Sequence, residues 1–130
     1  MILPITLAFA SLNALIFIFL SILVVRGRVT EKVSIGAGGK TNLELKIRTH
    51  GNFAEYVPLA LFLLALLEAN DQPQALLCLL GTALTVGRIS HAIGLRTVVA
   101  PNPFRFIGTL LTWVMITVAA VMGLCLTLVA

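Results

Sequence analysis

The sequence predicts an all-α integral membrane protein, built as one bundle of four helices. Hydrophobic residues make up 59% of the chain, charged residues only 11%, and the mean hydropathy is +1.08. This balance lies far from that of a soluble domain of the same length. Four apolar segments reach the ~20 residues that cross a hydrocarbon core of ~30 Å: roughly 2–25, 43–68, 74–95 and 104–129. They occupy nearly the whole chain, so we expect one membrane domain over residues 1–130.

The basic residues predict how the bundle is oriented. All nine flank the connection between the first two segments or the connection between the last two, whereas residues 68–73 hold two acids and no base. Cytoplasmic loops of membrane proteins carry the excess of Lys and Arg, so both basic connections should face the cytoplasm and both termini the periplasm. The nine residues are Arg26, Arg28, Lys32, Lys40, Lys46, Arg48, Arg88, Arg96 and Arg105.

Capping sequences mark three of the four helix starts. The pairs are Thr41 with Glu44, Asp71 with Gln74, and Asn102 with Pro103. The first two are read as capping boxes, and the third places a cap residue before a proline at the first helical position. Residues 27–41 form the only long, glycine-rich connection, and we expect them to be the most mobile segment.

A polar stripe is predicted on the second segment. Arg48, Asn52 and Glu55 recur at i, i+4 and i+7, which confines them to an arc of about 60° on a helix. A membrane carboxylate is costly unless it is paired or lines a watery cavity, so Glu55 is a candidate for a functional site. Alternatively, Arg48 and Glu55 neutralise each other and Asn52 bonds a neighbouring helix. Pro58 predicts a kink just beyond the stripe, which would open space beside Glu55.

The stripe also predicts self-association. Its polar groups need partners that a single four-helix bundle does not supply. We therefore expect a trimer in which the segment 43–68 lines the axis or the boundary between subunits.

Two further clusters of polar residues lie at the cytoplasmic ends of the other segments. Arg88 and His91 share one face of the third segment, where Gly87 and Gly94 allow close approach of a helix. The alternatives are an Arg88 that reaches the headgroups and a His91 with only a structural hydrogen bond.

Arg105 is predicted in the first turn of the fourth segment. The helix macrodipole is already positive there, so a basic side chain beside free backbone N–H groups forms an anion site. The alternative is that Arg105 binds a lipid phosphate at the membrane surface.

Residues 48–58 resemble the signature of a known family. Read as R-x-x-x-N-x-x-E-Y-x-P, they are similar to the second membrane helix of the MAPEG family, the membrane-associated proteins in eicosanoid and glutathione metabolism. The resemblance extends over the whole chain, including Gly87-Arg88-Ile89-Ser90-His91 and the arginine that opens the fourth segment. It implies a homotrimer with glutathione bound between adjacent subunits, near the cytoplasmic side.

The resemblance also implies roles for individual residues. Arg105 maps onto the arginine that stabilises the glutathione thiolate, which makes it the implied catalytic residue. Glutathione would be the cosubstrate, and the electrophile would be a lipophilic molecule entering from the surrounding lipid, with conjugation or peroxidase activity. No metal and no nucleic acid are expected. The implied glutathione-binding residues are Arg26, Arg48, Asn52, Glu55, Tyr56, Arg88 and His91.

Some positions depart from the family pattern. Leu95 stands where eicosanoid-synthesising members carry a tyrosine, and Gly51 stands where some members carry a basic residue. The short chain is more similar to the bacterial branch, which implies a multi-pass protein of the inner membrane. Two other functions remain open. One is a lipid- or glutathione-binding trimer without catalysis, and the other is a small proton-coupled exporter that uses Glu55.

Overall fold

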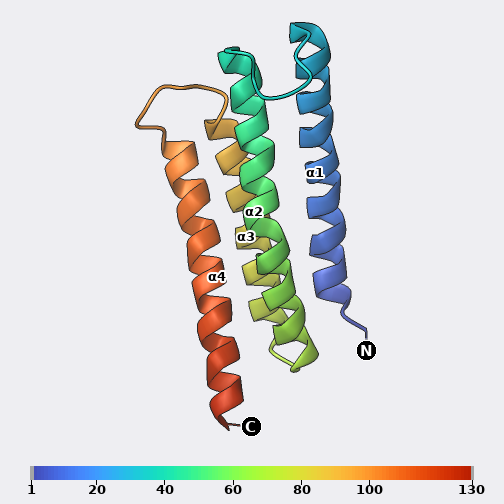
Figure 1. Cartoon of the computed structure of the whole chain (residues 1–130). Helices are drawn as coiled ribbons and strands as arrows, with labels where there is room; N and C mark the ends of the chain where they lie inside the picture. Colours follow the sequence, from blue (N-terminus) through green and yellow to red (C-terminus); the bar gives the residue numbers. More distant parts are fainter. Residues whose placement is uncertain (1, 130) are drawn as a thin grey trace.

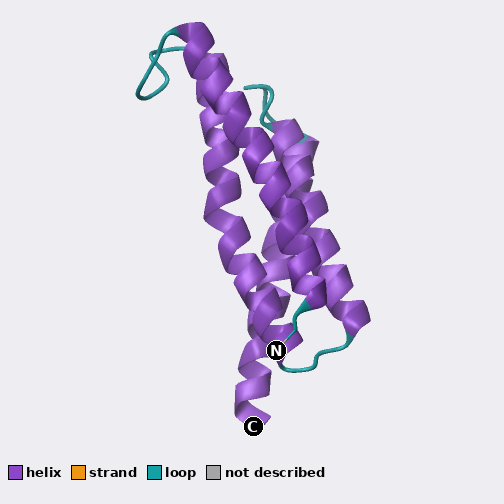
Figure 2. Cartoon of the chain, turned by 90° about the vertical axis from the view of Figure 1, so that its right-hand side faces the viewer, coloured by secondary structure: helices purple, strands orange, loops and turns teal. Residues whose placement is uncertain are grey.

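The computed structural model describes residues 2–129 and contains four α-helices in one bundle (Figure 1). Their bounds are Pro4–Glu31 (α1), Thr41–Ala69 (α2), Gln74–Gly94 (α3) and Pro103–Val129 (α4). Each helix is long and apolar enough to cross a membrane, and residues 2–129 contain no strand (Figure 2). The prediction of an all-α, four-helix membrane bundle is therefore confirmed.

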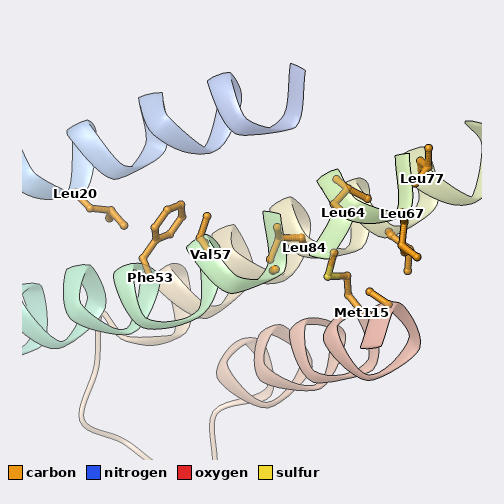
Figure 3. Close-up of a cluster of buried hydrophobic side chains, with 11 residues drawn as sticks. Leu20, Phe53, Val57, Leu64, Leu67, Leu77, Leu84 and Met115 are labelled. Carbon is orange, nitrogen blue, oxygen red and sulfur yellow. The ribbon is translucent and has the colours of Figure 1, made fainter. Parts of the chain in front are cut away.

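α2 and α3 form the middle of the bundle. α1 packs against α2 and α3 on one side, α4 packs against the same two helices on the other, and α1 and α4 lie apart. The core between them includes Phe53 and Leu64 of α2, Leu84 of α3 and Met115 of α4 (Figure 3). Both termini lie at one end of the bundle, and the connections 32–40 and 95–102 lie at the other (Figure 1). The basic connections thus share one end, as the sequence predicts.

α1 extends beyond its predicted end at residue 25. It continues to Glu31 and stops at Lys32, whose φ of 55° lies in the left-handed region that terminates helices. Arg28 then holds the shortened connection 32–40, since its Nη1 donates to the carbonyls of Ser34 (3.1 Å) and Gly36 (2.9 Å). Hydropathy marks where a helix leaves the lipid, whereas backbone hydrogen bonds decide where the helix ends.

The predicted cap of α4 is confirmed. Asn102 Oδ1 accepts the backbone N–H of Arg105 at 3.2 Å, and Pro103 is the first residue of the helix. The cap fixes where the first turn of α4 begins, and therefore where Arg105 lies.

The other two predicted caps are wrong. α2 already begins at Thr41, so Lys40 takes the capping position and makes no side-chain cap bond. Asp71 lies in a tight turn with φ of 54°, and Pro73 directly precedes α3, again without a side-chain cap bond. α2 thus begins one residue earlier than its capping pattern requires, and α3 begins two residues later. In neither helix does the predicted side chain lie where it can reach the free N–H groups.

Glu68 closes the opposite end of the bundle. It lies in the last turn of α2, and its two carboxylate oxygens accept the backbone N–H groups of Ile5 (2.8 Å) and Thr6 (2.6 Å). Leu3, at the capping position of α1, offers no side-chain acceptor for these groups. A carboxylate at the positive end of a helix dipole is stabilising, so Glu68 joins α1 to α2.

Glycines bring α3 and α4 into backbone contact. A Cβ on Gly108 would lie 2.5 Å from both the Gly87 carbonyl oxygen and the His91 backbone nitrogen. Such a contact is shorter than real Cβ atoms allow, and its partners are backbone atoms that cannot move independently. This close crossing determines how near α4 comes to the polar residues of α3.

Gly108→Ala should therefore destabilise the protein, by the roughly 1–3 kcal/mol typical of overpacking. Gly123→Ala is the matched control on the same helix, because nothing lies within 4 Å of a Cβ built there. Thermal unfolding in detergent should show a lower midpoint for Gly108→Ala alone. Equal midpoints for the two variants would mean that α3 and α4 do not cross this closely.

Candidate functional site

Arg88 is buried in the middle of the bundle and joins three helices. Only 2% of its surface is exposed. Its Nη1 donates to Asn52 Oδ1 of α2 at 2.7 Å, its Nε to Thr112 Oγ1 of α4 at 2.9 Å, and its Nη2 to the Gly108 carbonyl at 3.2 Å. The guanidinium is thus turned into the bundle and does not extend to the membrane surface.

The charge of Arg88 has no matching carboxylate. Within residues 2–129 the only ion pair joins Lys40 to Glu31 at 3.7 Å, on the surface. The partners of Arg88 are neutral oxygens and the ring of Tyr56, whose centroid lies 5.1 Å from the guanidinium carbon. A buried charge without a counterion leaves a positive potential around it, which favours an anion nearby.

Arg88 also determines which end of the Asn52 amide is free. A guanidinium has only donors, so the amide oxygen must face it, as the 2.7 Å contact shows. The amide N–H groups of Asn52 are then left to bond other molecules. Asn52 is therefore held with its amide N–H groups available as hydrogen-bond donors.

A cavity of about 370 Å³ lies beside this amide, between α2, the end of α3 and the start of α4. Its volume falls within the range of small-molecule sites. Four predicted site residues line it, namely Arg48, Asn52, His91 and Arg105, and we call it the Arg105 cavity. The complete lining is Thr41, Glu44, Leu45, Arg48, Asn52, His91, Leu95, Val98 and Arg105.

Gly94 brings Arg105 to the cavity. A Cβ on Gly94 would lie 2.5 Å from the Arg105 backbone nitrogen and 2.6 Å from its Cγ, so the end of α3 directly contacts the first turn of α4. Because the Asn102 side chain caps this turn, the guanidinium and the positive end of the α4 dipole act at the same place. The start of α4 therefore strengthens the attraction of the cavity for an anion.

Four predicted site residues do not line the cavity: Arg88, described above, and Glu55, Tyr56 and Arg26. Glu55 is exposed on α2, and no ion pair joins it to Arg48 within the described part of the chain, so these two residues do not neutralise each other in this structure. Tyr56 is half-buried beneath Arg88, and its hydroxyl accepts Trp113 Nε1 at 3.4 Å. Arg26 is exposed on α1, which lies away from α4.

Pro58 does not open space beside Glu55 as predicted. α2 remains helical from Thr41 to Ala69, across the proline. A cavity of about 360 Å³ does lie beside Pro58, but it is bounded by α1 residues such as Ala10 and Phe17, and Glu55 does not line it. The α2 residues that line this space are Phe53, Ala54, Val57, Pro58 and Leu61, so it opens on the side of α2 that faces α1.

Sequence reasoning missed two groups that hold Arg88, the Thr112 hydroxyl and the Gly108 carbonyl. The spacing of their residues in the sequence could have identified them. Arg105, Gly108 and Thr112 stand at i, i+3 and i+7, so all three residues share one face of α4. Glu44 was also missed as a cavity residue, because it was assigned to a cap. No group of three potential metal ligands occurs among the described residues.

The comparisons with known proteins agree with this architecture. The sequence model of the MAPEG family matches residues 6–125. The inner membrane protein YecN of Escherichia coli K12 is 37% identical over 86 residues, which cover 66% of this chain and 66% of YecN, and YecN of E. coli O6:H1 matches to the same extent. The match thus spans just under two thirds of these relatives, and no solved structure matches the chain significantly. With a family match over nearly its whole length and four membrane-spanning helices, the chain belongs to the MAPEG family.

Proposed function

We propose that this protein is a membrane glutathione transferase that binds glutathione in the Arg105 cavity and transfers it to a lipophilic electrophile. The observation that carries the proposal is the charge of this cavity. Arg48, Arg105 and the amide donor of Asn52 line it, the unpaired Arg88 lies behind it, and Glu44 is its one carboxylate. Glutathione carries two carboxylates and one ammonium group, so a site with several cations and one acid complements it.

Arg105 supplies the chemistry in this proposal. Its charge and the α4 N-terminus favour the thiolate of bound glutathione over the thiol, and the thiolate is the reactive nucleophile. No side chain of the protein needs to form a covalent intermediate, because glutathione itself attacks the electrophile.

The electrophile has an adjoining surface. A second cavity, of about 670 Å³, shares His91 and Arg105 with the Arg105 cavity and is otherwise mostly apolar. Phe106, Leu110 and Trp113 of α4 line it and are about half exposed or more, so it is open to the bilayer. A lipophilic molecule held there would lie beside the residue that favours the thiolate.

Glutathione binding and turnover test this function directly. Calorimetry on the purified protein should detect binding, and an aryl halide electrophile should be conjugated faster than in protein-free buffer. Arg48→Ala should weaken binding by about 10- to 100-fold, because a hydrogen bond to a charged group contributes about 1.5–3 kcal/mol. Lys40→Ala, an exposed basic residue outside the cavity, should bind as wild type does. Binding without conjugation would favour the non-catalytic alternative, and the absence of binding would refute the proposal.

The proposed assembly is a trimer in which Glu55 meets a basic residue of the neighbouring subunit. Glu55 is exposed on α2 without an ion-pair partner, and a carboxylate facing lipid alone is costly. Arg26 is exposed on α1, the helix that does not contact α4, and we propose it as the partner from the next subunit. This contact would complete the site with the residues that a single chain leaves outside the cavity.

Glu55→Ala should therefore weaken both the trimer and glutathione binding, since breaking a buried ion pair costs ~3–5 kcal/mol. Light scattering of the detergent complex would measure its protein mass. Glu31→Ala is the control, because its ion pair with Lys40 is exposed and such pairs contribute little. A monomeric wild-type protein would refute the proposed assembly.

We further propose that the protein lies in the bacterial inner membrane with the Arg105 cavity toward the cytoplasm. The cavity is at the same end of the bundle as the basic connections, and the relative YecN is named as an inner membrane protein. Alkaline phosphatase fused to the C-terminus should be active, as expected for a periplasmic end. An inactive fusion that is nevertheless expressed would reverse this orientation.

A further inference from the structure

A groove that is separate from both cavities of the proposed glutathione and electrophile sites runs between α1, α2 and α3. Its volume is about 570 Å³, and most of its surface is apolar, with Ile16 and Phe19 from α1 and Ile89 and Ile93 from α3. We call it the Lys46 groove. It shares only two residues with the Arg105 cavity, Leu45 and Leu95, which form a wall between the two.

One end of the Lys46 groove is positively charged. Lys46 and Arg96 line it together with the polar side chains of Asn42 and Thr49. Gly27 of α1 leaves room for Lys46, since a Cβ on this glycine would lie 3.2 Å from Lys46 Cδ and 3.5 Å from its Nζ. Neither cation has a carboxylate partner among residues 2–129. Two unmatched positive charges therefore stand at the end of the groove nearest the basic connections.

The apolar part of the groove is open to the hydrocarbon of the bilayer. Phe19 is 55% exposed, Ile89 43% and Ile93 41%, although all three line the groove. From Leu23 to Ile16, α1 extends ~10 Å along the groove, at 1.5 Å per residue. A molecule in the groove would thus have its polar head at the membrane surface and its tail along the helices, in direct contact with bilayer lipid.

We propose that the Lys46 groove binds an anionic glycerophospholipid of the bilayer, with the phosphate between Lys46 and Arg96 and one acyl chain along the apolar wall. Charge complementarity selects an anionic head, and basic pockets between membrane helices bind such headgroups. The open side selects a molecule that remains in the bilayer. This site involves neither Arg48 nor Arg105, so it stands whether or not the protein binds glutathione.

Native mass spectrometry of the purified protein can test the site with phosphatidylglycerol and phosphatidylcholine of identical acyl chains. Wild type should retain phosphatidylglycerol with a preference of up to about 30-fold, because each cation near a membrane surface strengthens anion binding by roughly fivefold. The double variant Lys46→Gln and Arg96→Gln should lose this preference. The control, Lys32→Gln with Lys40→Gln, removes the same charge from the adjoining connection outside the groove and should retain the preference.

A third variant tests the acyl chain. Ala92 lines the apolar wall, and Ala92→Phe should lower the retention of both lipids severalfold by filling the groove. Three results would overturn the proposal: no preference in wild type, equal losses in the two double variants, or unchanged lipid retention in Ala92→Phe. Wild-type oligomers that carry no lipid would likewise overturn it. That result would favour the alternative that a second copy of the chain covers the groove.

Discussion

Arg105→Ala should raise the pKa of the glutathione thiol in the bound state and slow turnover, while glutathione affinity stays within about tenfold of wild type. The thiol would lose a positive charge held at the start of α4, and each pKa unit corresponds to 1.36 kcal/mol, about tenfold in the ionisation constant. Affinity should change less, because Arg48 and Asn52 remain to bind the carboxylates. Ultraviolet titration of the thiolate, with glutathione saturating, measures the shift.

Two further variants define what Arg105 does. Arg105→Lys should recover part of the thiolate, since a point charge still helps but the geometry of the guanidinium is lost. Arg96→Ala is the matched control, because this arginine lies at the same end of the bundle but lines only the Lys46 groove. Identical titration curves for wild type and Arg105→Ala would assign Arg105 to lipid headgroups, and the thiolate role would pass to Arg88 or His91.

Arg88→Met should both destabilise the protein and weaken glutathione binding. The substitution fills part of the space but removes the donor to the fully buried Thr112 hydroxyl as well as the donor to Asn52, and an unsatisfied buried acceptor costs about 1–3 kcal/mol. The Asn52 amide is then free to turn, so the cavity loses a fixed donor. Thermal unfolding and calorimetry with glutathione measure the two effects separately.

Arg88→Lys distinguishes positioning from charge. The ammonium keeps the positive charge but cannot make the three bonds that reach Asn52, Thr112 and Gly108 from one planar group. We expect stability between that of wild type and Arg88→Met, and glutathione affinity close to that of Arg88→Met. If Arg88→Met has the same unfolding temperature and the same glutathione affinity as wild type, Arg88 does not organise the site.

The four helices could be predicted because hydropathy, summed over about 20 residues, is insensitive to single positions. Helix ends depend on individual bonds, so they were predicted less well. α1 continues to Glu31 through a stretch that includes Arg26, Arg28 and Thr30, where hydropathy no longer marks a membrane segment. Of the three capping sequences only Asn102 bonds its helix, because only there does the side chain lie at the capping position.

The candidate site could be predicted in part. Helical periodicity places Arg48 and Asn52 on one face, and the shared end of the bundle brings them to His91 and Arg105. The burial of Arg88 could not be predicted from α3 alone, because it depends on the Thr112 and Gly108 oxygens that α4 presents across the helix contact. The position of Glu55 outside the cavity likewise depends on which side of α2 the other helices cover.

The central claim is that the Arg105 cavity binds glutathione as its thiolate. The most direct measurement is the ultraviolet absorbance of detergent-purified wild-type protein as glutathione is added at neutral pH. We expect a thiolate absorbance that rises and saturates with glutathione, and no such absorbance with S-methylglutathione, which has no ionisable thiol. Protein that shows no thiolate absorbance at any glutathione concentration would contradict the claim.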